Sequence, residues 1–340
     1  MLNFTLRRLL IAVPTLLASA VVIFGLLQLA PGDPMANVPL TVPPEVKQRM
    51  REALGLGEPV HIQFWKWLVQ FFWIEPQVLI DHIFGTSLAE GKLRVLSWQT
   101  RSPVMDIVVQ RLPQTLWVVG TSYAVGILIA LPIGIYSAYR QYSVFDQAGT
   151  FISMVGYSVP TFFTGVLLIV IFSVNMPRES FFWFPSIYDT THVVDSWSAF
   201  GFQIRQMFLP VMVLALYNAA QISRFMRASM LDNLNQDYVR TARAKGVGER
   251  AVVMVHVLRN SLIPVVTVIA LGVPQVFGGA IITEQVFKVN GLGHLLIGAI
   301  EANDLPMVQT LTFIFAVLIV LFNLIADVLY GILDPRIRYD

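Results

Sequence analysis

The chain has 340 residues, of which 56% are hydrophobic and only 13% are charged, and its mean hydropathy is +0.67. Soluble domains carry about 25% charged residues, so this composition excludes an ordinary soluble domain and indicates an integral membrane protein. The net charge of +2 is too small to indicate a nucleic-acid partner, and without cysteine the chain has no disulfide, thiolate metal site or cysteine nucleophile.

The first predicted element begins close to the amino terminus. Arg7 and Arg8 precede an apolar run that continues without a charge over residues 9–32. The sequence Ala18-Ser19-Ala20 has the small residues of a signal-peptide cleavage site. The apolar core of a secretory signal spans only roughly 7 to 15 residues, however, and this run is longer. We therefore expect residues 1–30 to form a retained membrane anchor.

Six apolar segments are predicted to cross the membrane as helices. A crossing helix needs about 20 apolar residues, and only a helix satisfies its own backbone hydrogen bonds within the hydrocarbon. The fold class expected from this pattern is an all-α integral membrane protein, without internal repeats. The predicted spans are 9–30, 115–136, 151–174, 206–222, 262–282 and 310–333.

Residues 31–114 are predicted to form an outer segment that contains amphipathic helices. Residues 61–85 are aromatic enough to be considered as a seventh span, but Lys66, Glu75 and Asp81 interrupt them. A charge at the bilayer centre costs about 2.5–3.5 kcal/mol, which argues against a crossing. Two arrangements remain open: helices lying at the membrane interface, where aromatic rings collect, or rings packed against the outer end of the bundle.

The distribution of basic residues predicts the orientation. Short loops rich in Lys and Arg stay cytoplasmic. Here they lie before the first span, between the second and third, between the fourth and fifth, and after the sixth. Both termini are therefore predicted to be cytoplasmic, including a tail at 334–340. The segments 31–114, 175–205 and 283–309 are predicted to face outward.

The most distinctive segment is the basic stretch 224–260, which holds seven basic and three acidic residues. Gly246 and Gly248 are predicted to divide it into two short helical pieces, 233–245 and 249–260. One face of the second piece is apolar, and a short helix in water needs packing or a partner to be stable. Docking to a partner protein and resting on anionic lipid headgroups are both compatible with this pattern.

This stretch resembles the Glu-Ala-Ala loop of ABC-importer permeases, in which a small helix of the membrane subunit seats in a cleft of the cytoplasmic ATPase. Arg240-Thr241-Ala242 stands where that motif has Glu-Ala-Ala, and Gly246 stands at its glycine. The departures match the dipeptide, oligopeptide and nickel branch, whose Tyr-X-Arg-Thr-Ala-Arg-Ala-Lys-Gly run is similar to residues 238–246. Further matching pieces are LAPGDP (29–34), RLPQTL (111–116), RNSLIPVV (259–266), NGLGHL (290–295) and DPRIRY (334–339).

The resemblance covers the chain except about 39–103 and implies the type I ABC importer fold of a first ("B" type) permease. The chain would form half of a translocation pathway in the bacterial inner membrane, for di- or oligopeptides or a related small solute. Implied partners are a homologous second permease, two ABC ATPase subunits that bind ATP and Mg, and an external solute-binding protein. No catalytic residue, metal or cofactor is expected on this chain, which has no Gly-x-x-x-x-Gly-Lys-Ser/Thr loop.

The residues expected to couple to the ATPase share the basic loop within the permease core 115–333. They are Tyr238, Arg240, Thr241, Ala242, Lys245, Gly246, Gly248 and Glu249. Polar residues within the spans are candidates either for the pathway or for hydrogen bonds between helices. These are Asn218, Gln275, Asn323 and Asp327, the last of which is a candidate partner for a loop arginine, such as one of the basic loop.

Two other classes of function fit the sequence poorly. A proton-coupled secondary transporter is expected to carry an acidic or histidine relay near mid-membrane, but all five histidines lie outside the predicted spans. An integral-membrane enzyme needs clustered catalytic groups, and the sequence contains no His-Glu-x-x-His motif or nucleophile elbow. The identity of the solute remains open.

Overall fold

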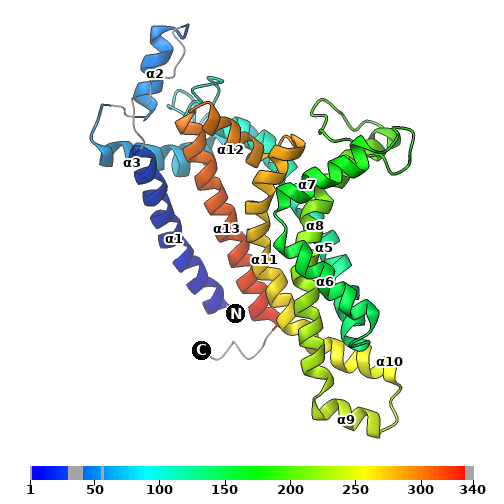
Figure 1. The fold of residues 1–340 in the computed structure, drawn as a ribbon. Coiled ribbons are helices and arrows are strands. Elements are labelled where there is room, and N and C mark those ends of the chain that lie inside the picture. Colours follow the sequence, from blue (N-terminus) through cyan, green and yellow to red (C-terminus); the bar gives the residue numbers. More distant parts are fainter. Residues whose placement is uncertain (1, 30–40, 55–56, 334–340) are drawn as a thin grey trace. The chain divides into compact units, whose positions relative to one another are not determined.

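The computed structural model describes residues 2–29, 41–54 and 57–333 (Figure 1). Regular structure in this part of the chain is helical, apart from one isolated bridge between Leu96 and Pro103. The predicted all-α class is therefore confirmed. The elements before the long central helices are α1 (Leu2–Gln28), α2 (Pro44–Leu54), α3 (Val60–Val69), the π-helical η1 (Gln70–Ile74) and α4 (Glu75–Phe84).

The central and carboxyl-terminal helices follow these elements. They are α5 (Val104–Tyr139), α6 (Val144–Ser158), α7 (Thr161–Ile169), η2 (Val170–Val174), α8 (Trp197–Leu234), α9 (Asp237–Ala244), α10 (Glu249–Ala251), η3 (Val252–Val257), α11 (Leu258–Phe287), α12 (Leu292–Glu301) and α13 (Leu305–Leu333).

Five helical stretches of the described chain are long and apolar enough to cross a membrane, and a bent pair is a candidate sixth. The five continuous ones contain the predicted spans two, four and five and overlap most of the predicted spans one and six. The predicted third span, 151–174, is instead divided between two helices, with a bend of 106° between them. Pro160 explains this bend, since proline disfavours the helical conformation of the residue before it, and Val159 is extended (φ −83°, ψ 128°).

The chain forms two compact units. The described part of unit 1 comprises residues 2–12, 114–294 and 318–333, and that of unit 2 comprises 13–29, 41–54, 57–113 and 295–317.

In unit 1, α8 packs along α11, and α6 and α7 also pack on α8 (Figure 1). The side chains between these helices are large and apolar, with Leu214, Met226 and Phe277 almost completely buried. Ser229 and Ser261 add a polar link between α8 and α11, because each hydroxyl donates to the other residue's carbonyl oxygen, at 2.8 and 3.2 Å. These contacts make α8 the central helix of the unit.

In unit 2, the aromatic helices of the outer segment have two different faces. Trp67 is 3% exposed and packs edge-on against Phe313 of α13 with ring centroids 5.2 Å apart. Trp65 and Trp73, in contrast, are about two-thirds exposed, at 66% and 65%. One face of the segment therefore packs on a neighbouring helix, as in one of the two expected arrangements, and the other face presents exposed aromatic rings.

Ionised groups fix the loops of unit 2. Arg94 donates bidentate hydrogen bonds to both Glu75 and Asp106, at 2.7 to 3.1 Å. Burial acts to lower the pKa of Arg94, but the two carboxylates outweigh it and raise that pKa. Asp304 is 1% exposed and accepts hydrogen bonds from the Ser97 hydroxyl and from the backbone amides of Trp98 and Gln99. It thereby ties the loop before α5 to the start of α13.

Candidate functional site

The candidate site is the turn of chain that follows α8. This helix ends at Leu234, and the amphipathic helix α9 then runs across its end (Figure 1). Val239 and Ala242 form the buried face of α9, at 0% and 8% exposure. Asp237 lies in the first turn of α9 and Arg243 in its last, and both charges are favourable to the helix dipole. The short helix is thus held by packing on one face, while its other face is open.

Gly246 makes the sharp turn after α9. Its φ of +77° lies in the left-handed region, which glycine adopts without the steric cost that a side chain incurs. The amides of Gly246 and Val247 donate to the carbonyl oxygens of Arg243 and Ala242, at 3.0 and 3.2 Å. Gly248 then caps α10. The predicted break at the two glycines is therefore present in the structure.

An ion pair closes this turn. Arg243 donates from Nε and Nη2 to the two carboxylate oxygens of Glu249, at 3.0 and 2.7 Å. These hydrogen bonds raise the pKa of the Arg243 guanidinium above its usual value. The pair joins the last turn of α9 to the first residue of α10, so that the two sides of the glycine turn are held at a fixed separation.

The second helical piece differs from its prediction. Residues 249–260 do not form a separate short helix, because α10, η3 and α11 continue as one helix from Glu249 to Phe287. Val252, Val253 and Val257 form a buried face that leads directly into the predicted fifth span. The six-residue π-helical stretch η3 lies within this passage, and such stretches occur often at functional sites. A displacement of the turn is therefore applied directly to a membrane-spanning helix.

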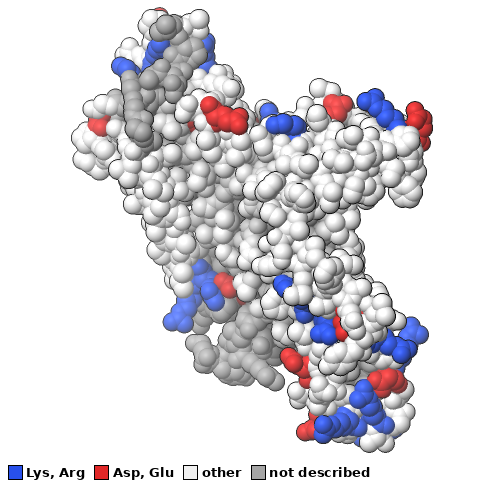
Figure 2. All heavy atoms as spheres, viewed as in Figure 1, with Lys and Arg blue, Asp and Glu red and all other residues white. Residues whose placement is uncertain are grey.

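Most of the predicted coupling residues lie on the surface of this turn. Tyr238, Arg240, Thr241, Lys245, Gly246, Gly248 and Glu249 are exposed, whereas Ala242 faces inward. The Tyr238 hydroxyl donates to Oδ1 of Asn233 at 2.8 Å, and the Thr241 hydroxyl donates to the Asp237 carbonyl oxygen at 2.9 Å. Figure 2 shows basic side chains gathered around α9 and α10. The exposed surface is therefore cationic and surrounds a well-packed corner.

The four polar span residues do not form one site. Asn218 is buried and donates to the Leu214 carbonyl oxygen of its own helix at 2.6 Å, while Gln275 and Asn323 are exposed. Asp327 forms an ion pair with Arg8 at 3.1 Å. Asp327 therefore pairs with an arginine, as expected, but this arginine is Arg8 of α1 and not one of the basic loop.

The sequence reasoning missed a fully buried carboxylate in α11. Glu284 is 0% exposed and accepts hydrogen bonds from the Thr115 hydroxyl at 2.8 Å and from the amides of Gly293 and His294 at 2.7 and 3.2 Å. A Cβ atom at Gly291 would lie 2.3 Å from Glu284 Oε1, which explains the glycine there. In the sequence, the two glycines of the NGLGHL stretch were the signal that a side chain from elsewhere in the chain occupies the space beside them.

Comparisons with known proteins find relatives along the whole chain. Residues 130–339 match the family described as "Binding-protein-dependent transport system inner membrane component", and residues 1–119 match the amino-terminal part of such membrane components. The oligopeptide transport system permease protein AppB of Bacillus subtilis is 37% identical over the full length of both chains. The glutathione transport system permease protein GsiC of Salmonella typhimurium is also 37% identical over both full lengths. A putative peptide permease protein of Brucella suis is 36% identical over 99% of each chain.

These matches confirm the predicted resemblance, including the role of a permease rather than an ATPase subunit. Together the two family matches cover the chain from residue 1 to residue 339, apart from 120–129. The chain therefore belongs to the family of binding-protein-dependent transport system inner membrane components, the multi-pass permease subunits of ABC importers.

Proposed function

We propose that this permease imports peptides, or a related small solute, and that the turn between α8 and α11 receives the movement of a cytoplasmic ATPase. Its partners in this proposal are a homologous second permease, two ATPase subunits that hold ATP and Mg, and an external solute-binding protein. Both termini and the α9 turn then lie in the cytoplasm, and the segment 31–114 faces outward. The core 115–333 forms half of the translocation pathway.

The observation that carries the coupling role is the construction of the corner formed by α9, the glycine turn and α10. A flexible loop would absorb a displacement, whereas a packed helix followed by a closed turn transmits it. Val239 and Ala242 pack α9 inward, and the pair between Arg243 and Glu249 closes the turn. An exposed pair of this kind adds little to stability, about 0–1 kcal/mol, so its geometry matters more than its energy.

The exposed side of the same corner supports protein docking. Arg240 and Lys245 extend from it, and each is exposed. Long cationic side chains around a short amphipathic helix can engage an acidic protein cleft or anionic lipid headgroups. The family relationship favours the protein cleft, since a binding-protein-dependent permease needs a partner that supplies energy.

The solute class rests on the relatives. The names of the relatives from Bacillus subtilis, Salmonella typhimurium and Brucella suis refer to oligopeptides, glutathione and peptides. All three are solutes with peptide bonds, which supports a short peptide as the solute of this chain. Equilibrium binding of dipeptides, longer peptides and glutathione to the cognate solute-binding protein tests this part of the proposal. If the solute-binding protein bound none of the three, the proposed solute class would be contradicted.

The absence of cysteine from the natural sequence permits a direct test of docking. A single Lys245→Cys variant, co-expressed with its ATPase subunits, is treated in membrane vesicles with a short bifunctional crosslinker. We expect a crosslinked species that contains the ATPase and whose yield changes when ATP is added. The matched control is Gln141→Cys, which places an exposed cysteine in the turn between α5 and α6.

Two outcomes would count against the coupling role. One is equal crosslinking from positions 141 and 245, which would indicate contact without a specific dock. The other is labelling of Lys245→Cys in intact cells by a membrane-impermeant maleimide, which would place the turn on the outer side. Uptake that continues after depletion of ATP, with the ion gradient intact, would instead favour a secondary transporter.

A further inference from the structure

A largely buried ion pair joins the first turn of α6 to the central helix α8. Arg227 of α8 donates from Nε and Nη2 to the two carboxylate oxygens of Asp146, at 2.5 and 2.8 Å. The Asp146 side chain is only 3% exposed and that of Arg227 is 26% exposed. Both residues belong to unit 1, and Arg227 lies two turns before the end of α8 at Leu234. The pair is therefore close to the point where α8 leads into α9.

Asp146 also organises the chain around it. Its carboxylate accepts a hydrogen bond from the amide of Tyr142 at 2.9 Å, and its own amide donates to the Ser143 hydroxyl that caps α6. Tyr142 has a φ of +62°, an uncommon left-handed conformation for a residue with a side chain. The carboxylate thus fixes the first turn of α6 and the strained turn before it, and Arg227 holds both of these to α8.

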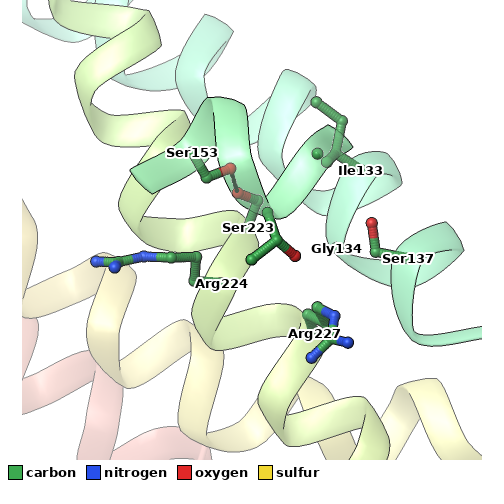
Figure 3. A pocket seen from close by; sticks show the side chains of 9 residues that line it. Ile133, Gly134, Ser137, Ser153, Ser223, Arg224 and Arg227 are labelled. Carbon is green, nitrogen blue, oxygen red and sulfur yellow. Dashed lines mark hydrogen bonds between the residues drawn. The ribbon is translucent and has the colours of Figure 1, made fainter. Parts of the chain in front are cut away.

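Further contacts hold the same stretch of α8 to its neighbours. Figure 3 shows Ser153 of α6 and Ser223 of α8 pointing toward each other, and their hydroxyl oxygens are 3.1 Å apart. On α5, a Cβ atom at Gly134 would lie 2.6 Å from both Met226 Cβ and the Ser223 carbonyl oxygen, so α5 and α8 are in very close contact.

The space between these helices is too small for a solute. Its volume is about 10 Å³, which is room for roughly one water molecule. Ser137 and Arg224 also line this space (Figure 3). The region is therefore a packed junction of three helices rather than a pocket for a solute.

We propose that Asp146 and Arg227 are positioning residues that pass the movement of the α9 turn from α8 to α6. This inference rests on the coupling role proposed above. Between Arg227 and Leu234 the helix α8 is continuous, so a displacement at α9 reaches Arg227 with little loss. Beyond Asp146, α6 runs to the 106° bend before α7, which is a natural place for the movement to become a rotation.

The chemistry of the pair suits this task better than apolar packing does. Two parallel hydrogen bonds between a guanidinium and a carboxylate fix orientation as well as distance. Apolar surfaces can slide past each other with little change in energy, whereas this fork cannot slide without separating charges that are mostly shielded from water. The junction therefore transmits both translation and rotation of α8.

The test uses the complete transporter in proteoliposomes: both permeases, both ATPase subunits and the substrate-loaded binding protein. The variants are Asp146→Asn, Arg227→Gln and the double variant. We expect each single variant to lower uptake at least tenfold while the ATPase keeps its basal rate but loses its stimulation by the loaded binding protein. Because the two residues act as one unit, the double variant should transport no worse than either single variant.

Controls separate this role from a merely structural one. Arg140→Gln removes a charge from the exposed turn between α5 and α6. Within the described chain, Arg140 contacts the Tyr139 ring but forms no ion pair, so this variant should transport normally. Each variant is combined with Lys245→Cys, and the crosslink to the ATPase should be retained. If Arg227→Gln does not assemble, Arg227→Lys keeps the charge but loses the fork, and it should show partial uptake with weakened stimulation.

Three results would overturn the inference: normal uptake by both single variants, multiplying losses in the double variant, or an ATPase still stimulated by the loaded binding protein while uptake is lost. Loss of the crosslink only in the Asp146 and Arg227 variants would also overturn it, because the pair would then merely maintain the shape of the turn. If the Lys245→Cys parent itself fails to crosslink, the proposed coupling role fails first, so the two failures are distinguishable.

Discussion

Replacing Glu284 with alanine should destabilise the protein strongly. The carboxylate is completely buried and serves three donors: the Thr115 hydroxyl and the amides of Gly293 and His294. Leaving a buried donor without its acceptor costs about 1–3 kcal/mol. The loss of the acceptor for three donors should therefore lower the free energy of unfolding by at least about 3 kcal/mol, less any part that is recovered by water entering the site. Glu284→Gln should be intermediate, because the amide keeps one acceptor oxygen but turns an NH₂ group toward the remaining donors.

The assay is thermal unfolding of the detergent-purified protein, followed by the fluorescence of its seven tryptophans. The control is Glu301→Ala, since Glu301 is exposed at the end of α12. We expect the highest Tm for Glu301→Ala, an intermediate Tm for Glu284→Gln and the lowest Tm, far below wild type, for Glu284→Ala. Equal Tm values for Glu284→Ala and Glu301→Ala would refute the reasoning that this carboxylate holds α5, α11 and the start of α12 together.

Three further predictions follow from other close contacts. Gly134→Ala should destabilise by about 1–3 kcal/mol, because its Cβ meets α8 at 2.6 Å, whereas Gly120→Ala, which faces open space, should leave Tm unchanged. The Gly246→Val variant should insert into the membrane normally yet lose most uptake activity, because a side chain at φ +77° costs about 1–2 kcal/mol and shifts the turn. The control variant Gly248→Ala should transport normally, because Gly248 has an ordinary φ of −59°. Asp304→Ala should accelerate hydrogen exchange at the amides of Trp98 and Gln99, which lose their acceptor, without changing exchange at Leu88 and Ala89, held by Asp81.

Hydropathy identified the membrane helices but not their true lengths. The fourth predicted span covers residues 206–222, yet α8 runs from Trp197 to Leu234. Apolar content marks only the part of a helix that lies in hydrocarbon, and polar residues continue the same helix beyond it. The bend at Pro160 was predictable from the proline, but its angle of 106° depends on how α6 and α7 pack against α8 and α11.

The candidate site was only partly accessible from the sequence. The glycine turn and the exposed cations of the basic loop follow from local residue types. The partners of the buried carboxylates do not, because Thr115 and Glu284 are separated by 169 residues, and Asp146 and Arg227 by 81. Nothing local distinguishes these carboxylates from exposed ones, so their roles emerge only once the helices are packed.

The sharp bend between α6 and α7 limits how far this part of the chain can reach. The two arms contain 15 and 14 residues, which at 1.5 Å per residue gives lengths of about 22 and 21 Å. A bend of 106° leaves about 74° (180° minus 106°) between the two arms, so their far ends are only about 26 Å apart, less than the hydrocarbon thickness of about 30 Å. If the pair is one membrane span, the lipid leaflets must thin beside it, or adjoining protein must take their place.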